Sequence, residues 1–119
     1  MTDPRRVVGQ AGEDAVASWY AAAGYEVLDR NWRVREGEID IVARRAATVV
    51  FCEVKTRRSD AFGTPAEAVT ARKQVRLRKL AVHWLRDNDV RADVLRFDVA
   101  SVLPDGRGAW IVDVFEAAF

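Results

Sequence analysis

Two charged side chains in residues 48–56 have a spacing that phosphoryl chemistry can use. Glu53 and Lys55 are two residues apart, so on a β-strand both side chains point to the same face. A carboxylate there can bind a divalent metal ion, and the neighbouring ammonium can hold a water molecule or a phosphate oxygen. The same spacing also suits an ordinary salt bridge at the end of a strand, so the pair alone does not define a site.

Asp40 supplies a second carboxylate from residues 38–44. This segment and residues 48–56 are rich in β-branched residues and are joined by a short connection, which predicts a hairpin. Asp40 and Glu53 are equally far from the centre of that connection, so the hairpin would place them nearly opposite each other. Opposed like charges destabilise a sheet unless a cation or a proton intervenes, and oxygen donors without His or Cys favour Mg²⁺ or Mn²⁺ over zinc. A shifted register would instead leave Asp40 in solvent.

Two helical segments carry the remaining candidates. Glu13 lies on a predicted first helix, where its carboxylate either joins the acids of the hairpin or is simply solvated. Lys73 lies within the apolar stripe of a later helix, from which its ammonium reaches either the rim of the helix or the carboxylates. The other candidate contacts to backbone phosphates are Gln74, Arg57, Arg72 and Arg76, and Arg78 and Lys79 extend the basic face of the helix.

The helix that carries Glu13 is predicted over residues 7–23, because small and apolar side chains recur there at spacings of three and four. Gly24 would end this helix, since a residue without a Cβ is favoured just after the last turn. The side chains that form the stripe are Val8, Ala11, Ala15, Trp19 and Ala22.

The later helix is predicted over residues 64–87. Thr64 can cap it, Pro65 suits the first helical position, and Glu67 completes a capping box. Asn88 marks its end. Its apolar stripe consists of Val69, Leu77, Leu80 and Trp84, with Lys73 among them.

Strands complete the pattern. In the third strand, apolar residues on both faces predict that it is covered from both sides. The order of helix, three strands, helix and two strands predicts an α/β fold, with helices flanking a mixed central sheet and a parallel crossover through the second helix. The predicted strands cover residues 25–33, 38–44, 48–56, 92–101 and 109–115.

The composition describes one globular domain spanning residues 1–119, with 50% hydrophobic residues and only three prolines. A single cysteine, Cys52, allows neither an internal disulfide nor a Cys-based zinc site, and it favours a reducing compartment. The sequence has no apolar run long enough for a signal peptide or a membrane span. We therefore expect a cytoplasmic protein that does not enter a membrane.

Charge is unevenly distributed along the chain, although the net charge is only +1. Residues 55–96 hold eleven basic and five acidic residues, whereas the rest of the chain holds eight basic and thirteen acidic residues. Such polarisation can present a positive face to a polyanion, and it is also compatible with ordinary solvated helix charges.

Taken together, these segments resemble the small bacterial YraN-like proteins, a family placed in the PD-(D/E)XK nuclease superfamily and similar to archaeal Holliday-junction resolvases. The resemblance covers nearly the whole chain, although Ile39 stands where the superfamily name has a proline. The matching segments are residues 9–13, 24–31, 37–40, 51–55, 62–69 and 96–99, together with Lys73.

The resemblance implies a restriction-endonuclease-like αβββαβ core and a nucleic-acid phosphodiester as the substrate. Glu13 would match the helix carboxylate of the resolvases and Asp40 the first strand acid. Glu53 and Lys55 would match the acid and the lysine of the signature. Resolvase-like relatives act as symmetric dimers, so a homodimer is a further expectation.

The leading hypothesis is therefore a metal-dependent endonuclease acting on DNA, including branched DNA. Asp40, Glu53 and Glu13 would hold Mg²⁺ or Mn²⁺, and Lys55 would position the attacking water or stabilise charge on phosphorus. The alternative is a non-catalytic nucleic-acid-binding or adaptor domain that keeps the fold and the site. A purely structural interaction protein would show neither metal dependence nor salt-sensitive DNA binding.

Overall fold

The computed structural model describes residues 4–57 and 69–119, and for residues 4–8 only the course of the helix backbone. The elements follow one another along the chain in the order α1 (Pro4–Ala22), β1 (Glu26–Val34), β2 (Gly37–Arg45), β3 (Thr48–Thr56), α2 (Ala71–Asp87), β4 (Val94–Pro104) and β5 (Trp110–Phe115). This order confirms the predicted α/β fold with an αβββαβ core, which β5 follows.

The strands form one mixed sheet in the order β1-β2-β3-β4-β5. All neighbours are antiparallel except β3 and β4, which pair in parallel from Thr48 opposite Val94 to Thr56 opposite Val102. The predicted crossover is thus confirmed, because α2 lies between these two strands in the chain. No helix in the described part of the chain combines the length and the apolarity needed to cross a membrane.

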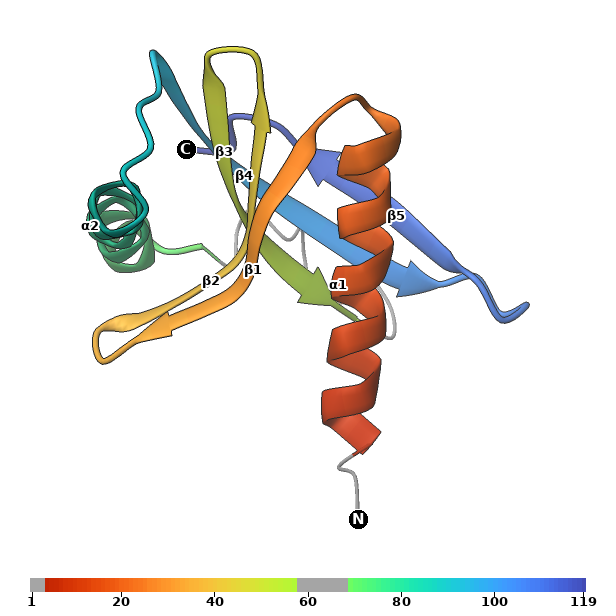
Figure 1. The fold of residues 1–119 in the computed structure, drawn as a ribbon. Coiled ribbons are helices and arrows are strands. Elements are labelled where there is room, and N and C mark those ends of the chain that lie inside the picture. The colour runs from red at the N-terminus through yellow and green to blue at the C-terminus, as the bar shows by residue number, and fades with distance from the viewer. Residues whose placement is uncertain (1–3, 58–68) are drawn as a thin grey trace.

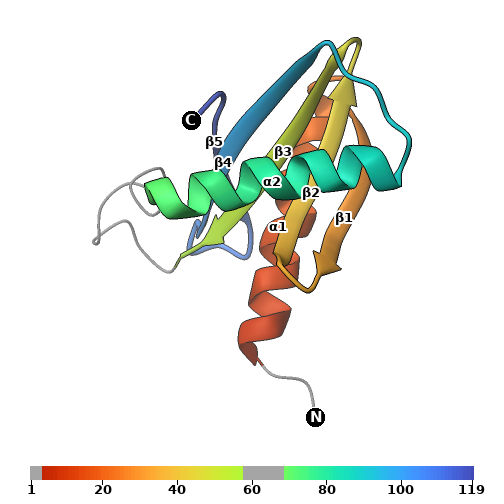
Figure 2. The ribbon, with the colours of Figure 1, turned by 90° about the vertical axis from the view of Figure 1, so that its left-hand side faces the viewer.

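The two helices cover opposite faces of the sheet, as Figures 1 and 2 show from two directions. Successive side chains of β3 point to opposite faces of the sheet. Val50 and Cys52 pack toward α1, whereas Val49 and Phe51 pack toward α2. The α1 side is completed chiefly by Val16, Tyr20, Ile41, Ala43, Ala100 and Val102. The α2 side is completed chiefly by Val42, Leu80, Ala81, Trp84 and Phe97.

The buried face of α1 differs from the predicted stripe. Gly12, Val16 and Tyr20 face the sheet, whereas Ala22 is exposed. The hydroxyl of Tyr20 donates a hydrogen bond of 2.6 Å to the buried carboxylate of Asp98 on β4. Burying a large aromatic ring with a bonded hydroxyl stabilises this orientation more than burying alanines would.

The start of α2 also differs from the prediction. The helix begins at Ala71, and Val69 and Thr70 are not helical, so a continuous helix from residue 64 is wrong. Thr70 has an extended backbone and its hydroxyl accepts a hydrogen bond from the Lys73 amide, which makes it the N-cap. The predicted cap residues Thr64, Pro65 and Glu67 lie outside the described residues.

Candidate functional site

The site forms where the ladder between β2 and β3 ends. Ile41 opposite Cys52 is the last pair of that ladder, and Asp40 and Glu53 are the next residues on the two strands. Beyond this point β2 bends away from β3 (Figure 1). The carboxylate of Asp40 accepts a hydrogen bond of 2.8 Å from the Val54 amide, and the side chain is half-buried. A register that leaves Asp40 in solvent is therefore excluded.

The side chains around this point interrupt the expected alternation. Ile39 packs on the α2 side of the sheet, whereas Ile41 packs on the α1 side. A regular strand would place these two isoleucines on one face, and they differ here because β2 changes direction where it leaves β3. This bend opens the sheet, so groups from both faces approach Asp40.

Glu53 and Lys55 emerge from the far part of β3 on its α2 side. Their side chains form an ion pair with 2.8 Å between Lys55 Nζ and Glu53 Oε1, and each is mostly buried. This is the salt bridge that the spacing of two also allowed. The ammonium group therefore lies directly beside the acids, where it can exchange its partner for another anionic oxygen.

Glu13 joins the site from α1. The preceding residue, Gly12, faces Thr56 so closely that a Cβ atom would collide with the threonine hydroxyl, which allows α1 to approach the end of β3. Burial, and then the negative charge of Asp40, raise the pKa of Glu13 to about 7, although Arg30 opposes them. Within the described part of the chain, the buried Oε1 atom of Glu13 has no hydrogen-bond partner.

The carboxyl of Asp40 is perturbed in the same direction. Burial raises its pKa to about 6, and the charges of Glu38 and Glu53 add to that increase. The Val54 amide and the ammonium of Lys55 oppose them by stabilising the charged form. Two carboxyl groups therefore hold their protons up to near-neutral pH in the absence of a cation.

Glu38 is a fourth acid that the sequence analysis did not include in the site. It is exposed, and its Oε2 atom forms an ion pair of 2.9 Å with Nε of Arg33 across the β1–β2 turn. Its charge raises the pKa of both Glu13 and Asp40. The sequence could have indicated that Glu38 lies near the site, because Glu38 and Asp40 are two residues apart on one strand and so share a face.

The acids fit a hard divalent cation by their chemistry but do not form a cage. In residues 4–57 and 69–119, no three His, Cys, Asp or Glu side chains are arranged to hold a metal ion. The donor set nevertheless consists of carboxylate oxygens, which Mg²⁺ and Mn²⁺ prefer. The unbonded oxygen of Glu13 and the two raised pKa values, which come first from burial, mark carboxyl groups whose negative charge is poorly stabilised.

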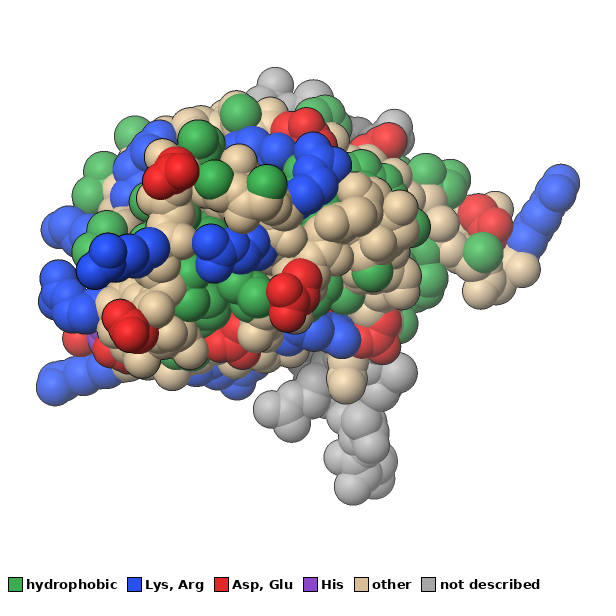
Figure 3. All heavy atoms as spheres, turned by 45° about the horizontal axis from the view of Figure 1, so that its top comes forward, with side chains coloured by type: hydrophobic (Ala, Val, Ile, Leu, Met, Phe, Trp, Pro, Cys, Tyr) green, Lys and Arg blue, Asp and Glu red, His purple; other side chains and the backbone are tan. Residues whose placement is uncertain are grey.

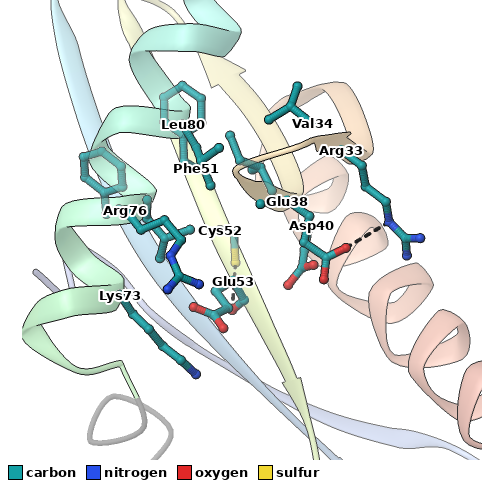
Figure 4. A pocket seen from close by; sticks show the side chains of 14 residues that line it. Arg33, Val34, Glu38, Asp40, Phe51, Cys52, Glu53, Lys73, Arg76 and Leu80 are labelled. Atoms are coloured by element: carbon teal, nitrogen blue, oxygen red, sulfur yellow. Dashed lines mark hydrogen bonds and ion pairs between the residues drawn. The ribbon is translucent and has the colours of Figure 1, made fainter.

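Basic residues of α2 face these acids across a cleft of about 570 Å³ (Figure 4). Lys73 and Arg76 line the cleft from α2 and extend toward Glu53. The rest of its wall is largely apolar and comes from both the helix and the sheet. The main apolar lining residues are Ile39, Phe51, Leu77, Leu80 and Phe97.

The other predicted phosphate contacts lie outside the cleft. Arg72 is exposed on α2, and the side-chain amide of Gln74 donates a hydrogen bond of 3.2 Å to the Val69 carbonyl. Arg57 follows β3, and its amide donates to the Val102 carbonyl at 2.8 Å. Figure 3 shows Lys and Arg side chains gathered toward the α2 side of the molecule, with a few acidic side chains among them.

Fold and site together define an α/β protein whose acidic residues meet where a central hairpin opens beside a cationic helix. Residues 12–102 match the family model described as "Uncharacterised protein family UPF0102". A UPF0102 protein of Beutenbergia cavernae is 51% identical over 102 residues, which cover 86% of each chain. A UPF0102 protein of a Parafrankia species is 47% identical over 112 residues, which cover 94% of this chain and 95% of the relative. The chain belongs to the UPF0102 family, the family of the YraN-like proteins that the sequence resembles.

Proposed function

We propose that this protein is a metal-dependent hydrolase of nucleic-acid phosphodiesters, acting on DNA. The observation that carries the proposal is the convergence of Glu13, Asp40 and Glu53 beside Lys55, at the point where β2 leaves β3. The first helix and the two strands of one hairpin bring these charges together, although like charges oppose folding. A cation that binds in the folded state would offset that repulsion.

The resemblance to PD-(D/E)XK nucleases supports the same assignment of roles. Asp40, Glu53 and Glu13 would hold Mg²⁺ or Mn²⁺, which would polarise the scissile phosphate and lower the pKa of a bound water. Lys55 would release Glu53 and turn its ammonium to the attacking water or to the oxygens that gain charge in the transition state. Asp40 would be held in place for this task by its bond to the Val54 amide.

The basic residues would orient the backbone of the substrate. Lys73 and Arg76 extend from α2 into the cleft on the side opposite Asp40. Their positive charges would bind phosphates next to the scissile one, and this contribution should weaken as salt increases. The guanidinium of Arg76 can also bind two oxygens of one phosphate.

A panel of DNA substrates with Mn²⁺ tests the proposal. Branched, nicked, single-stranded and duplex DNA are incubated with the wild type, with Asp40→Asn and with Lys55→Ala. Cleavage of at least one substrate that both variants abolish is the expected result. Arg107→Ala is the matched control, because it removes a positive charge from the exposed turn between β4 and β5. Cleavage that Asp40→Asn leaves intact would refute the assignment, because the activity would then come from another site or from a contaminating nuclease.

Metal binding is measured separately by calorimetry and by thermal unfolding. The wild type should release or take up heat on titration with Mn²⁺ and should unfold at a higher temperature in its presence. If neither effect occurs, the three carboxylates are not a metal site.

A second function, nucleic-acid binding without hydrolysis, is favoured by one specific observation. Glu53 and Lys55 already neutralise each other at 2.8 Å, and the described acids do not form a metal cage. A binding domain would use Lys73 and Arg76 without needing to separate that ion pair. Salt-sensitive binding of DNA that stays intact with Mn²⁺ would favour this function over the first.

A further inference from the structure

The cleft beside the acids has apolar lining as well as charged groups. Leu77 on α2 is half-buried, whereas Leu80, Phe51 and Phe97 lie beneath it with only 3–4% of their surface exposed. Ions and backbone phosphates gain nothing from such a surface, because it offers neither charge nor hydrogen bonds. An apolar wall next to charged groups is typical of a pocket that binds a ligand with both kinds of surface.

The apolar lining is closely packed where it meets the sheet. The rings of Phe51 and Phe97 are stacked with 5.7 Å between their centroids, and Phe119 also stacks with Phe97, at 5.3 Å. Arg78 lies over Phe97 with its guanidinium carbon 4.9 Å from the ring centroid. These contacts hold the rings in place, so the cleft is formed before any ligand arrives.

The wall of the cleft that α2 forms is more accessible to solvent than the wall that the sheet forms. Leu77 is half-buried, and Arg76 next to it is exposed. A guanidinium group is planar and can stack on an aromatic ligand while its edge binds an anion. Arg76 and Leu77 therefore present a flat cation and an aliphatic surface to the same volume.

Duplex DNA cannot use this combination. Its bases are stacked and paired, so its outer surface offers phosphates, sugars and base edges to a concave wall. An unpaired nucleotide offers a phosphate and a free base together, and proteins bind such bases by stacking and apolar contact. The cleft volume of about 570 Å³ lies within the range of sites that enclose small organic ligands.

On the basis of the proposed function, we propose that this cleft receives an unpaired DNA base while the adjoining phosphate lies at Asp40 and Glu53. The preferred substrate would then be DNA with an unpaired nucleotide, not a continuous duplex. Lys73 would bind the phosphate on the other side of that nucleotide. The base would be recognised by its flat apolar surface, so sequence preference would be slight.

Fluorescence anisotropy with three labelled DNA molecules tests this proposal on the wild type. The first is a duplex with one unpaired thymidine, the second carries an abasic residue at the same position, and the third is fully paired. Binding is measured with Ca²⁺, a hard divalent cation that carboxylates also bind, and a gel verifies afterwards that the DNA is intact. We expect the unpaired thymidine to bind about tenfold tighter than either of the others, in line with the effect of one stacked base. Equal affinity for all three molecules, or no binding of any, would overturn the proposal.

Two serine variants of α2 locate the preference in the cleft. Leu77→Ser should reduce the ratio between the thymidine and abasic affinities to about threefold or less, while binding of the abasic molecule is retained. Val75→Ser is the matched control, because Val75 is 53% exposed on the same helix and does not line the cleft. A ratio that falls equally in both variants would show that the base is bound elsewhere.

These results separate the base-binding cleft from the proposed hydrolysis. If the unpaired thymidine is preferred but remains uncleaved with Mn²⁺, the base-binding cleft stands and the hydrolase proposal fails. If duplex and unpaired DNA are bound equally and both are cleaved, the hydrolase proposal stands and the base-binding cleft fails.

Discussion

Replacing Asp40 by asparagine should stabilise the protein at alkaline pH. The pKa of Asp40 is about 6 in the folded protein, against an ordinary value of 3.8. Because the folded state binds this proton more tightly than the unfolded state, the stabilisation is complete below about pH 4. It is lost as the pH rises to 6 and beyond. The difference in pKa corresponds to about 3 kcal/mol for this largely buried carboxyl group.

The asparagine variant keeps a side-chain oxygen for the Val54 amide but never acquires the charge. Compared with the wild type, its free energy of unfolding should be about 1–3 kcal/mol higher at pH 8 and nearly the same at pH 4. Urea unfolding followed by tryptophan fluorescence at pH 4, 6 and 8 measures this difference. Asp113→Asn, which removes an exposed carboxylate on β5, should change stability by less than about 0.5 kcal/mol throughout.

A divalent cation should reduce the difference in stability between the two proteins at pH 8. At ten times its dissociation constant, Mn²⁺ would stabilise the wild type by about 1.4 kcal/mol through its preference for the folded state. Asp40→Asn should gain much less, because one of the proposed ligands is neutral. The reasoning is refuted if Asp40→Asn destabilises the protein equally at pH 4 and pH 8, since the carboxylate would then contribute through its contacts and not through its charge.

Three further substitutions test individual contacts. Gly12→Ala should lower the free energy of unfolding by about 1–2 kcal/mol because its methyl group meets Thr56, and adding Thr56→Ala should restore most of that loss in a double-mutant cycle measured by urea unfolding. Tyr20→Phe removes a donor from the buried Asp98 carboxylate and should cost about 1–3 kcal/mol, measured as a lower thermal midpoint. Lys55→Met removes the positive charge that opposes proton binding by Asp40, so NMR titration should give a higher pKa for Asp40. An unchanged or lower value would place the ammonium group elsewhere in solution.

The strands could be predicted well because their signals are local. The predicted bounds of β3, residues 48–56, agree with the structure, and the assignment of alternate side chains to two faces is confirmed. Hairpin symmetry also placed Asp40 and Glu53 at adjoining positions of β2 and β3. These inferences need only the period of two and the length of one turn.

The helices were harder to predict because more than one pattern fits each of them. In α1, the spacing of three and four permits the stripe of Ala11, Ala15 and Trp19 as well as the observed face of Gly12, Val16 and Tyr20. The choice depends on Asp98 and Thr56, which are distant in sequence. In α2, the capping signal at Thr64 predicted an earlier start, whereas Thr70 is the N-cap of the helix that begins at Ala71.

The acidic cluster was only partly accessible from the sequence for the same reason. Two of its members lie on one hairpin, and their proximity follows from counting residues. Glu13 joins them only because α1 approaches the end of β3, and Ile39 leaves the expected face only because β2 bends. Gly12 permits the approach but does not name its partner, and the bend has no signal in the local sequence.

The hydrogen bond between Tyr20 and Asp98 also joins parts of the fold that the ribosome makes at different times. It joins residues that are 78 positions apart, and the ribosome delivers Tyr20 long before Asp98. The first helix and the three-stranded meander therefore emerge with the inner surface of that helix still lacking its polar partner. Glu13 sits on this helix, so the last of the contacts that hold the helix on the sheet form when β4 is added. A nascent chain that stops before β4 would carry all three acids but lack the contacts of α1 with Asp98, Ala100 and Val102.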